Sequence, residues 1–169
     1  MEEPILNRVE ASGIIQLELE RWLEAPDVVS CDLADELIDG FVLMEKPFRE
    51  AVAGWKSADF EGNNVALYCS ADAIVPDWAW MVAASRIVEL GGQPLVGDVE
   101  TVRQRCFLRA VAAADVSEFE GARVMLRGCA SVGGTPVLVA VVERLQPIVR
   151  SLMYGEACSA VPVYKKPRR

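Results

Sequence analysis

The feature that most constrains the fold of this chain is an alternation of short apolar runs and longer helical patterns between residues 65 and 127. Three apolar runs have the length and composition of buried strands: Val65–Cys69, Pro94–Gly97 and Ala122–Arg127. Between the first two, the alanine-rich segment Pro76–Leu90 predicts a largely buried helix that ends at two glycines. Asp98 is a suitable N-cap for a second helix that extends to about Ala114.

Further elements are predicted on both sides of this region. Residues 14–20 alternate apolar and polar side chains, as a half-buried strand does. Val28–Cys31 is a second short strand, and Pro47 occupies a favoured first position of a helix. Val137–Leu145 is predicted as a long strand, and the apolar character continues through Ile148–Tyr154.

This order of elements predicts a mixed α/β fold. Strands that alternate with helices favour a parallel sheet with right-handed crossovers and covering helices. We therefore expect one globular domain over residues 1–169, with a central, largely parallel sheet around residues 65–127 and flanking antiparallel strands. Residues 165–169 form a short basic tail.

The chain contains no histidine among its 169 residues. This absence excludes Ser-His-Asp and Cys-His nucleophile systems, His-ligated haem and the zinc and iron sites that need an imidazole. Proton transfer near neutral pH would require a carboxylate, Cys, Lys or Tyr with a shifted pKa. Any bound metal would need thiolate or oxygen ligands.

Charge and cysteine content restrict the partners and the compartment. The net charge is −8, and without the cations of the basic tail it is −12, which argues against nucleic acid as a partner. The acidic start Met1–Pro4 does not resemble a signal peptide, and no apolar run is long enough to cross a membrane. Five cysteines without framework spacing indicate reduced thiols, so we expect a cytoplasmic protein.

Thiols and carboxylates follow several predicted strands. Cys69, Asp98 and Cys129 come at or just after strand ends, Asp72 follows Cys69 closely, and Cys158 lies in a similar loop of small residues. If the strands share one parallel sheet, these groups meet at one edge, where thiolates would select zinc, Cu(I) or an iron–sulfur cluster. The alternatives are that each thiol is a small buried hydrophobe and that Asp98 only caps its helix. Cys31 and Cys106 are expected to fill the core.

Several motifs point to a family. Cys69–Pro76, Gly97–Glu100, Gly128-Cys129, Tyr154–Lys165 and the opening Ile5–Gly13 together resemble the bacterial DUF2480 family, over essentially the whole chain. Members are described as having no established function. Genes of this family are often found beside genes for iron–sulfur cluster assembly of the SUF type, so the resemblance implies, by association, an accessory role there, with assembly proteins as partners.

Three functions remain open at this point. The first is an accessory binding protein that holds a metal or cluster, or docks on the assembly machinery, through the thiol-bearing edge. The second is a thiol enzyme or sulfur carrier that uses Cys69, whose position ahead of a helix start favours the thiolate. The third is a structural or interaction protein, with a homodimer through an edge strand such as Ile14–Glu20 or Val137–Leu145.

Overall fold

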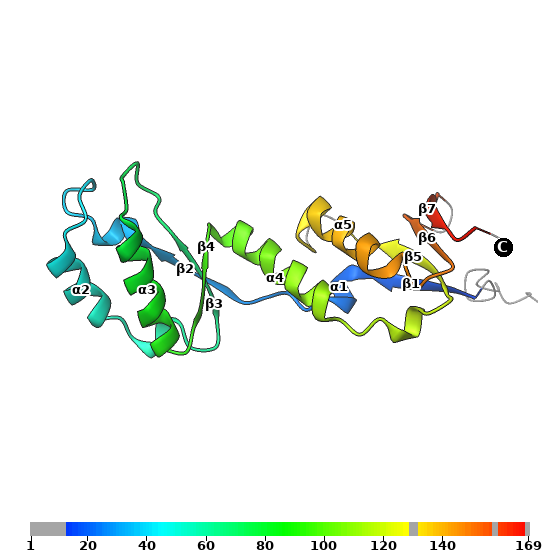
Figure 1. The fold of residues 1–169 in the computed structure, drawn as a ribbon, viewed down its shortest axis with the longest axis horizontal. Helices are drawn as coiled ribbons and strands as arrows, with labels where there is room; N and C mark the ends of the chain where they lie inside the picture. The colour runs from blue at the N-terminus through cyan, green and yellow to red at the C-terminus, as the bar shows by residue number, and fades with distance from the viewer. Residues whose placement is uncertain (1–12, 129–131, 157–158, 168–169) are drawn as a thin grey trace, which may run out of the picture. The chain divides into compact units, whose positions relative to one another are not determined.

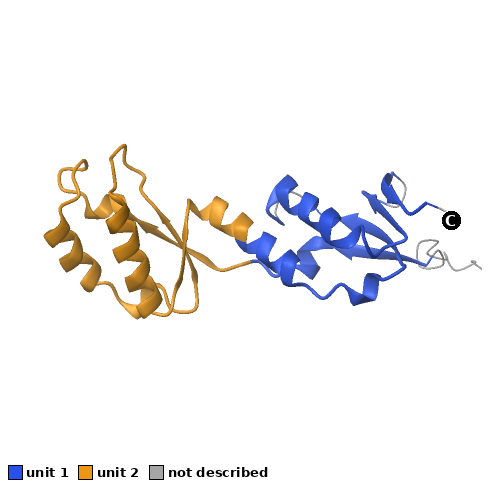
Figure 2. Cartoon of the chain, in the orientation of Figure 1, with its two compact units in different colours: residues 1–25, 106–169 blue, residues 26–105 orange. Residues whose placement is uncertain are grey.

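The structure, a computed structural model, describes residues 13–128, 132–156 and 159–167. It separates into two compact units: unit 1 comprises residues 1–25 and 106–169, and unit 2 comprises residues 26–105 (Figure 2). The chain passes from unit 1 to unit 2 after residue 25 and returns to unit 1 after residue 105, within helix α4 (Val99–Ala113). Each unit contains both strands and helices, so the mixed α/β class is confirmed.

Unit 2 is built on three parallel strands. They lie in the order β2 (Val28–Asp32), β3 (Asn64–Tyr68) and β4 (Gln93–Val96). Helix α2 (Glu45–Ala53) connects the first two strands, and α3 (Asp77–Glu89) connects the second and third (Figure 1). The strands follow one another in the sheet in the same order as in the sequence. Two right-handed crossovers in the same direction therefore place both helices on the same face of the sheet.

The core of unit 2 lies between that face and the two helices. Val65 and Leu67 of β3 are buried against α3, whose residues Ala79, Ala83 and Ile87 recur at the four-residue spacing of a helix face. Phe48 of α2 contributes a ring that meets Trp78 edge-on at 5.7 Å between centroids. Two 3-10 turns complete the unit: η2 (Leu33–Glu36) and η3 (Ser57–Asp59).

Unit 1 is built on a four-stranded sheet. Its strands lie in the order β1 (Ile14–Glu18), β5 (Arg123–Arg127), β6 (Ser151–Tyr154) and β7 (Val161–Lys165). The first three are parallel, and β7 pairs antiparallel with β6. In the described part of this unit, helical segments besides α4 are α1 (Leu19–Trp22), η4 (Ser117–Phe119) and α5 (Gly134–Leu145).

One face of this sheet packs on helices α4 and α5. Val124 and Leu126 of β5 and Leu152 of β6 are buried in the same core as Val111 of α4 and Val141 of α5. Successive residues of a strand point to opposite faces, so the residues between these core positions lie on the face away from the two helices.

The expected single sheet around residues 65–127 is wrong, because its three strands belong to two sheets. β3 and β4 pair in unit 2, whereas β5 pairs with β1 and β6 in unit 1. The expected strands at residues 14–20 and Val28–Cys31 are parallel to their neighbours as β1 and β2, and within the described chain the antiparallel strand is β7, which is not among the strands predicted above. An apolar strand pattern indicates which residues are buried but contains no information on which strand is the neighbour.

The expected strand Val137–Leu145 is also wrong, because these residues form most of α5. Its valines favour a strand by propensity, but Val137, Val141 and Leu145 are the buried positions and recur every fourth residue. Gly133, with φ of 81°, precedes the helix, and Pro136 occupies its first turn. Within the described residues, no helix has the length and apolar composition needed to span a membrane.

Candidate functional site

The residues predicted as a shared thiol and carboxylate site are distributed over two sheets. Cys69 follows β3 and Asp98 follows β4, both at the carboxyl edge of the unit 2 sheet. Cys129 and Cys158 lie outside the described residues, and the strands that precede them, β5 and β6, belong to the sheet of unit 1. The premise that all three strand ends share one sheet edge is therefore wrong.

The described donors of this set do not fit a metal or a cluster. Cys69 is half-buried against the core of unit 2, and its Sγ donates a hydrogen bond to the carbonyl oxygen of Ala71 at 3.7 Å. Asp72 is exposed in the loop that follows. Among the residues that the structure describes, no three His, Cys, Asp or Glu side chains are grouped so as to hold a metal ion.

Asp98 caps a helix, as its position in the sequence predicted. Its Oδ1 accepts a hydrogen bond from the backbone N–H of Thr101 at 2.7 Å, at the start of α4. This bond is the main reason why the pKa of Asp98 lies below its usual value. The carboxylate therefore stays ionised and bound to the helix, which is unsuitable for proton transfer near neutral pH.

Asp32 organises the same edge and was not singled out from the sequence. Its Oδ1 accepts from the backbone N–H groups of Ala34 and Ser70, each at 2.9 Å, so it joins the turn η2 to the loop after β3. Burial acts to raise the pKa of Asp32, but the hydrogen bonds from Ser70 and Ala34 outweigh it and lower this pKa. The available signal was an aspartate at a strand end directly before a helical turn.

A hairpin after η2 exposes large apolar side chains. Ile38 N–H donates to the carbonyl of Val42 at 2.8 Å, around a turn in which Asp39 and Gly40 have φ of 52° and 74°. An Asp-Gly pair between apolar residues is a strong hairpin signal, so this turn was predictable. Phe41, at the tip, is 73% exposed, and Val42 and Met44 are more than half exposed.

The neighbouring loop adds a further apolar side chain. Ile74 is 92% exposed in the segment between β3 and α3, which the Ser70–Asp32 hydrogen bond ties to the start of η2. Because β2 and β3 are parallel, both segments leave the sheet at the same edge. We call the exposed apolar residues of the two segments the edge patch: Ile38, Phe41, Val42, Met44 and Ile74.

The edge patch lies in a strongly acidic part of the chain. Unit 2 has 14 Asp and Glu against 6 Lys and Arg, a net charge of −8, whereas unit 1 has 11 of each. From Asp32 to Glu45 there are five carboxylates and no Lys or Arg. The pKa of the Cys31 thiol is raised to about 12, mainly by burial and in addition by the negative charges of Glu36, Asp32 and Asp35.

The carboxyl edge of the unit 1 sheet has a different character. Arg127, at the end of β5, binds Glu156 through two hydrogen bonds, Nε to Oε1 at 3.2 Å and Nη2 to Oε2 at 2.6 Å. Its Nη1 donates to Gln16 at 3.0 Å and lies 3.5 Å from Glu18. The hydrogen bonds to Glu156 are the main reason why the pKa of Arg127 is raised. This guanidinium is occupied in joining three strand ends, so we assign it a structural role.

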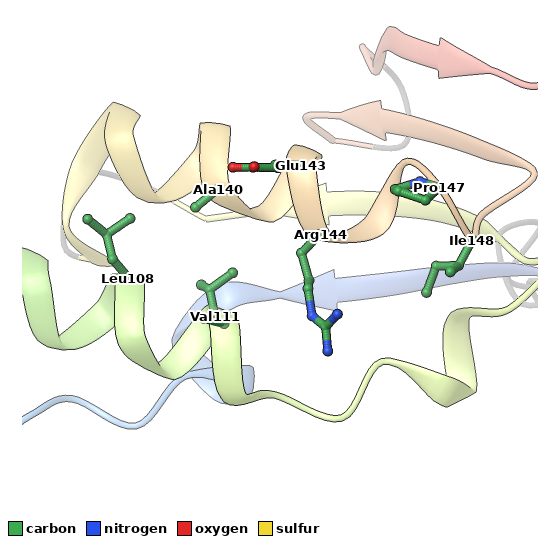
Figure 3. A pocket seen from close by; sticks show the side chains of 8 residues that line it. Leu108, Val111, Ala140, Glu143, Arg144, Pro147 and Ile148 are labelled. Atoms are coloured by element: carbon green, nitrogen blue, oxygen red, sulfur yellow. The ribbon is translucent and has the colours of Figure 1, made fainter.

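An apolar groove lies between α4 and α5 of unit 1 (Figure 3). It encloses about 490 Å³, and Leu108 and Val111 of α4 face Ala140 of α5 across it. Arg144 reaches from α5 toward the end of α4, where its Nη2 donates to the carbonyl of Ala114 at 3.3 Å. Glu143 and Arg144, both of α5, are the charged residues among the described lining of the groove.

The chain is a mixed α/β protein with two small sheets. Its most distinctive feature is the exposed apolar edge patch in an acidic segment, and not a group of metal-ligating side chains among the described residues. The chain belongs to the family described as protein of unknown function (DUF2480), whose model matches residues 3–166, as its motifs indicated. No curated protein matches the chain, and no solved structure matches it.

Proposed function

We propose that this protein is an accessory binding protein that docks on a protein partner through the edge patch of unit 2. The observation that carries the proposal is that five large apolar side chains are exposed, four of them in the segment from Asp32 to Glu45. That segment has five carboxylates and no Lys or Arg. Several large apolar side chains exposed at one edge, with polar and charged residues around them, are typical of a protein interaction site.

The tip of the hairpin is suited to anchor such a contact. Phe41 is held on a turn closed by the Ile38–Val42 backbone hydrogen bond, so little backbone freedom is lost when it binds. Covering most of an aromatic side chain contributes roughly 1–2 kcal/mol from burial alone. Phe41 is therefore the expected centre of the interface.

Charge determines which kind of partner fits. A partner that brings Lys and Arg around an apolar surface would be attracted by the five carboxylates between Asp32 and Glu45. A second copy of unit 2 would place like charges opposite one another, which opposes self-association through this patch. The partner chemistry is thus a basic amphipathic segment of another protein.

Within this function, proteins of iron–sulfur cluster assembly are the partners that we propose to test first. The support for this choice is the resemblance of the chain to its family, which implies that setting. Thiol ligation by Cys69 is not needed for it, because the edge patch would make the contact.

The test is a binding titration of the full chain with two probes. The first probe is a synthetic helical peptide with leucines on one face and lysines on the other, and the second is a purified iron–sulfur assembly scaffold. We expect Phe41→Ser to weaken binding of the peptide by about tenfold or more. Val139→Ser is the matched control, because Val139 is 61% exposed and belongs to unit 1, which contains none of the edge-patch residues.

Three outcomes would count against the proposal. Equal binding of the peptide by wild type and Phe41→Ser would exclude the edge patch as the docking site. A concentration-dependent dimer that Phe41→Ser abolishes would make a second copy the occupant. Binding of the peptide without binding of the scaffold would keep the docking function and reject only the assembly partner.

A further inference from the structure

A basic cavity lies on unit 1, separate from the edge patch. It encloses about 430 Å³, and four cations line it: Arg123, Arg150, Lys165 and Lys166. Among the residues that the structure describes, none that lines it is a carboxylate. This composition differs from that of the whole unit, which has equal numbers of acidic and basic residues.

The register of the sheet explains why Arg123 and Lys165 lie on the same face. Arg123 of β5 is in register with Ser151 of β6, which is in register with Lys165 of β7. Residues opposite one another on neighbouring strands point to the same face, so the three side chains form a row across the sheet. Their chain neighbours Val124 and Leu152 are buried under α4 and α5, so the row lies on the face away from those helices.

The other two cations, Arg150 and Lys166, lie where β6 begins and β7 ends. The backbone N–H of Lys166 donates to the carbonyl of Arg150 at 2.9 Å, which places two like-charged residues directly opposite each other. Within the described part of the chain, none of the four side chains forms an ion pair. Like charges opposite one another in a sheet are unfavourable unless an anion compensates them.

We propose that this cavity binds a small molecule that carries two or more phosphoryl groups. Guanidinium groups match phosphate oxygens in pairs, and lysine ammonium groups supply additional point charges. The hydroxyl of Ser151, in the middle of the row, can donate to an oxygen between Arg123 and Lys165.

The walls of the cavity favour a small molecule over a long polyanion. Met153 and Pro162, paired on β6 and β7, line it together with Ile14 of β1, so part of its lining is apolar. A volume of about 430 Å³ is in the range of small-ligand pockets. The ligand class is therefore a di- or triphosphate with an organic body that covers these side chains.

The experiment is a calorimetric titration of the full chain with inorganic triphosphate and with adenosine triphosphate at about 50 mM and about 200 mM NaCl. We expect binding that weakens at the higher salt concentration. Arg123→Gln with Lys165→Gln should weaken it by at least about tenfold. Arg21→Gln with Arg109→Gln is the matched control, because it removes the same charge from unit 1 outside the cavity.

A second measurement separates a binding role from a structural one. Without ligand, Lys166→Gln should keep or raise the melting temperature, because it removes a cation opposite Arg150. Equal loss of binding in the cavity and control variants would overturn the proposal, since net charge alone would then explain it. Tighter binding of a single-stranded oligonucleotide or of anionic lipid vesicles than of either triphosphate would also overturn it, as would no binding at low salt.

Discussion

Replacement of Asp32 by alanine is the perturbation whose consequence can be worked out most fully. Asp32→Ala removes the oxygen that accepts from Ala34 N–H and Ser70 N–H, each at 2.9 Å. Loss of a capping side chain costs about 0.5–2 kcal/mol, and hydrogen bonds to a charged group contribute somewhat more than neutral ones. Water reaches this partly exposed carboxylate, so we expect a loss of about 1.5 kcal/mol in the free energy of unfolding.

Urea unfolding measures this loss. Three of the four tryptophans lie in unit 2, and the indole of Trp80 donates to the carbonyl of Val75 in the loop that Asp32 holds, so tryptophan fluorescence reports mainly on the affected unit. Asp32→Asn is the matched control, because its amide oxygen can still accept both hydrogen bonds without the charge. It should lose about half as much stability as Asp32→Ala.

The pH dependence gives an independent check. The pKa of Asp32 is lower in the folded protein than in the unfolded chain, so its ionised form stabilises the fold. The difference in stability between wild type and Asp32→Asn should be constant near neutral pH and shrink as the pH falls through the folded pKa of Asp32. An unchanged urea midpoint for Asp32→Ala, or a difference independent of pH between about 2 and 7, would refute this reasoning.

Two further predictions test the electrostatics of unit 2 and the revised assignment of α5. The raised pKa of Cys31 means that the unfolded chain loses this proton first, so stability should fall as the pH rises from about 9 toward 12, with a limiting slope of about 1.4 kcal/mol per pH unit. The free energy of unfolding of Cys31→Ala, measured by urea titration, should fall less steeply over that pH range than that of the wild type. Parallel curves of stability against pH for the two proteins would contradict the raised pKa of Cys31. Val139→Ala, at an exposed position of α5, should raise stability by roughly 0.5 kcal/mol, because alanine favours a helix. The same change in a strand would lower it, so thermal unfolding distinguishes the two.

Local structure was largely predictable because it depends on local patterns. The apolar runs at Val65–Cys69 and Ala122–Arg127 match β3 and β5 within one residue at each end, and Asp98 caps its helix as expected. Strand partners were not predictable, because β5 pairs with β1, a strand more than a hundred residues earlier. No local pattern of burial identifies such a partner.

The candidate site was predicted only in part for the same reason. Cys69 and Asp98 do share a sheet edge, but the grouping with the positions after β5 and β6 assumed one sheet. The single-domain expectation stays a prediction, which the unfolding curves can test by showing one transition or two. The pair Asp39-Gly40 indicates a hairpin turn in the edge patch from sequence alone. The exposure of the apolar side chains could not be predicted, because it depends on how the rest of unit 2 packs.

The most direct measurement of the central claim is amide hydrogen exchange of the full chain with and without the basic amphipathic peptide. We predict slower exchange, on binding, in residues 37–44 and 70–76, which carry the edge patch, and no change in the strands of unit 1. Protection confined to unit 1, or no protection at saturating peptide, would contradict docking through unit 2.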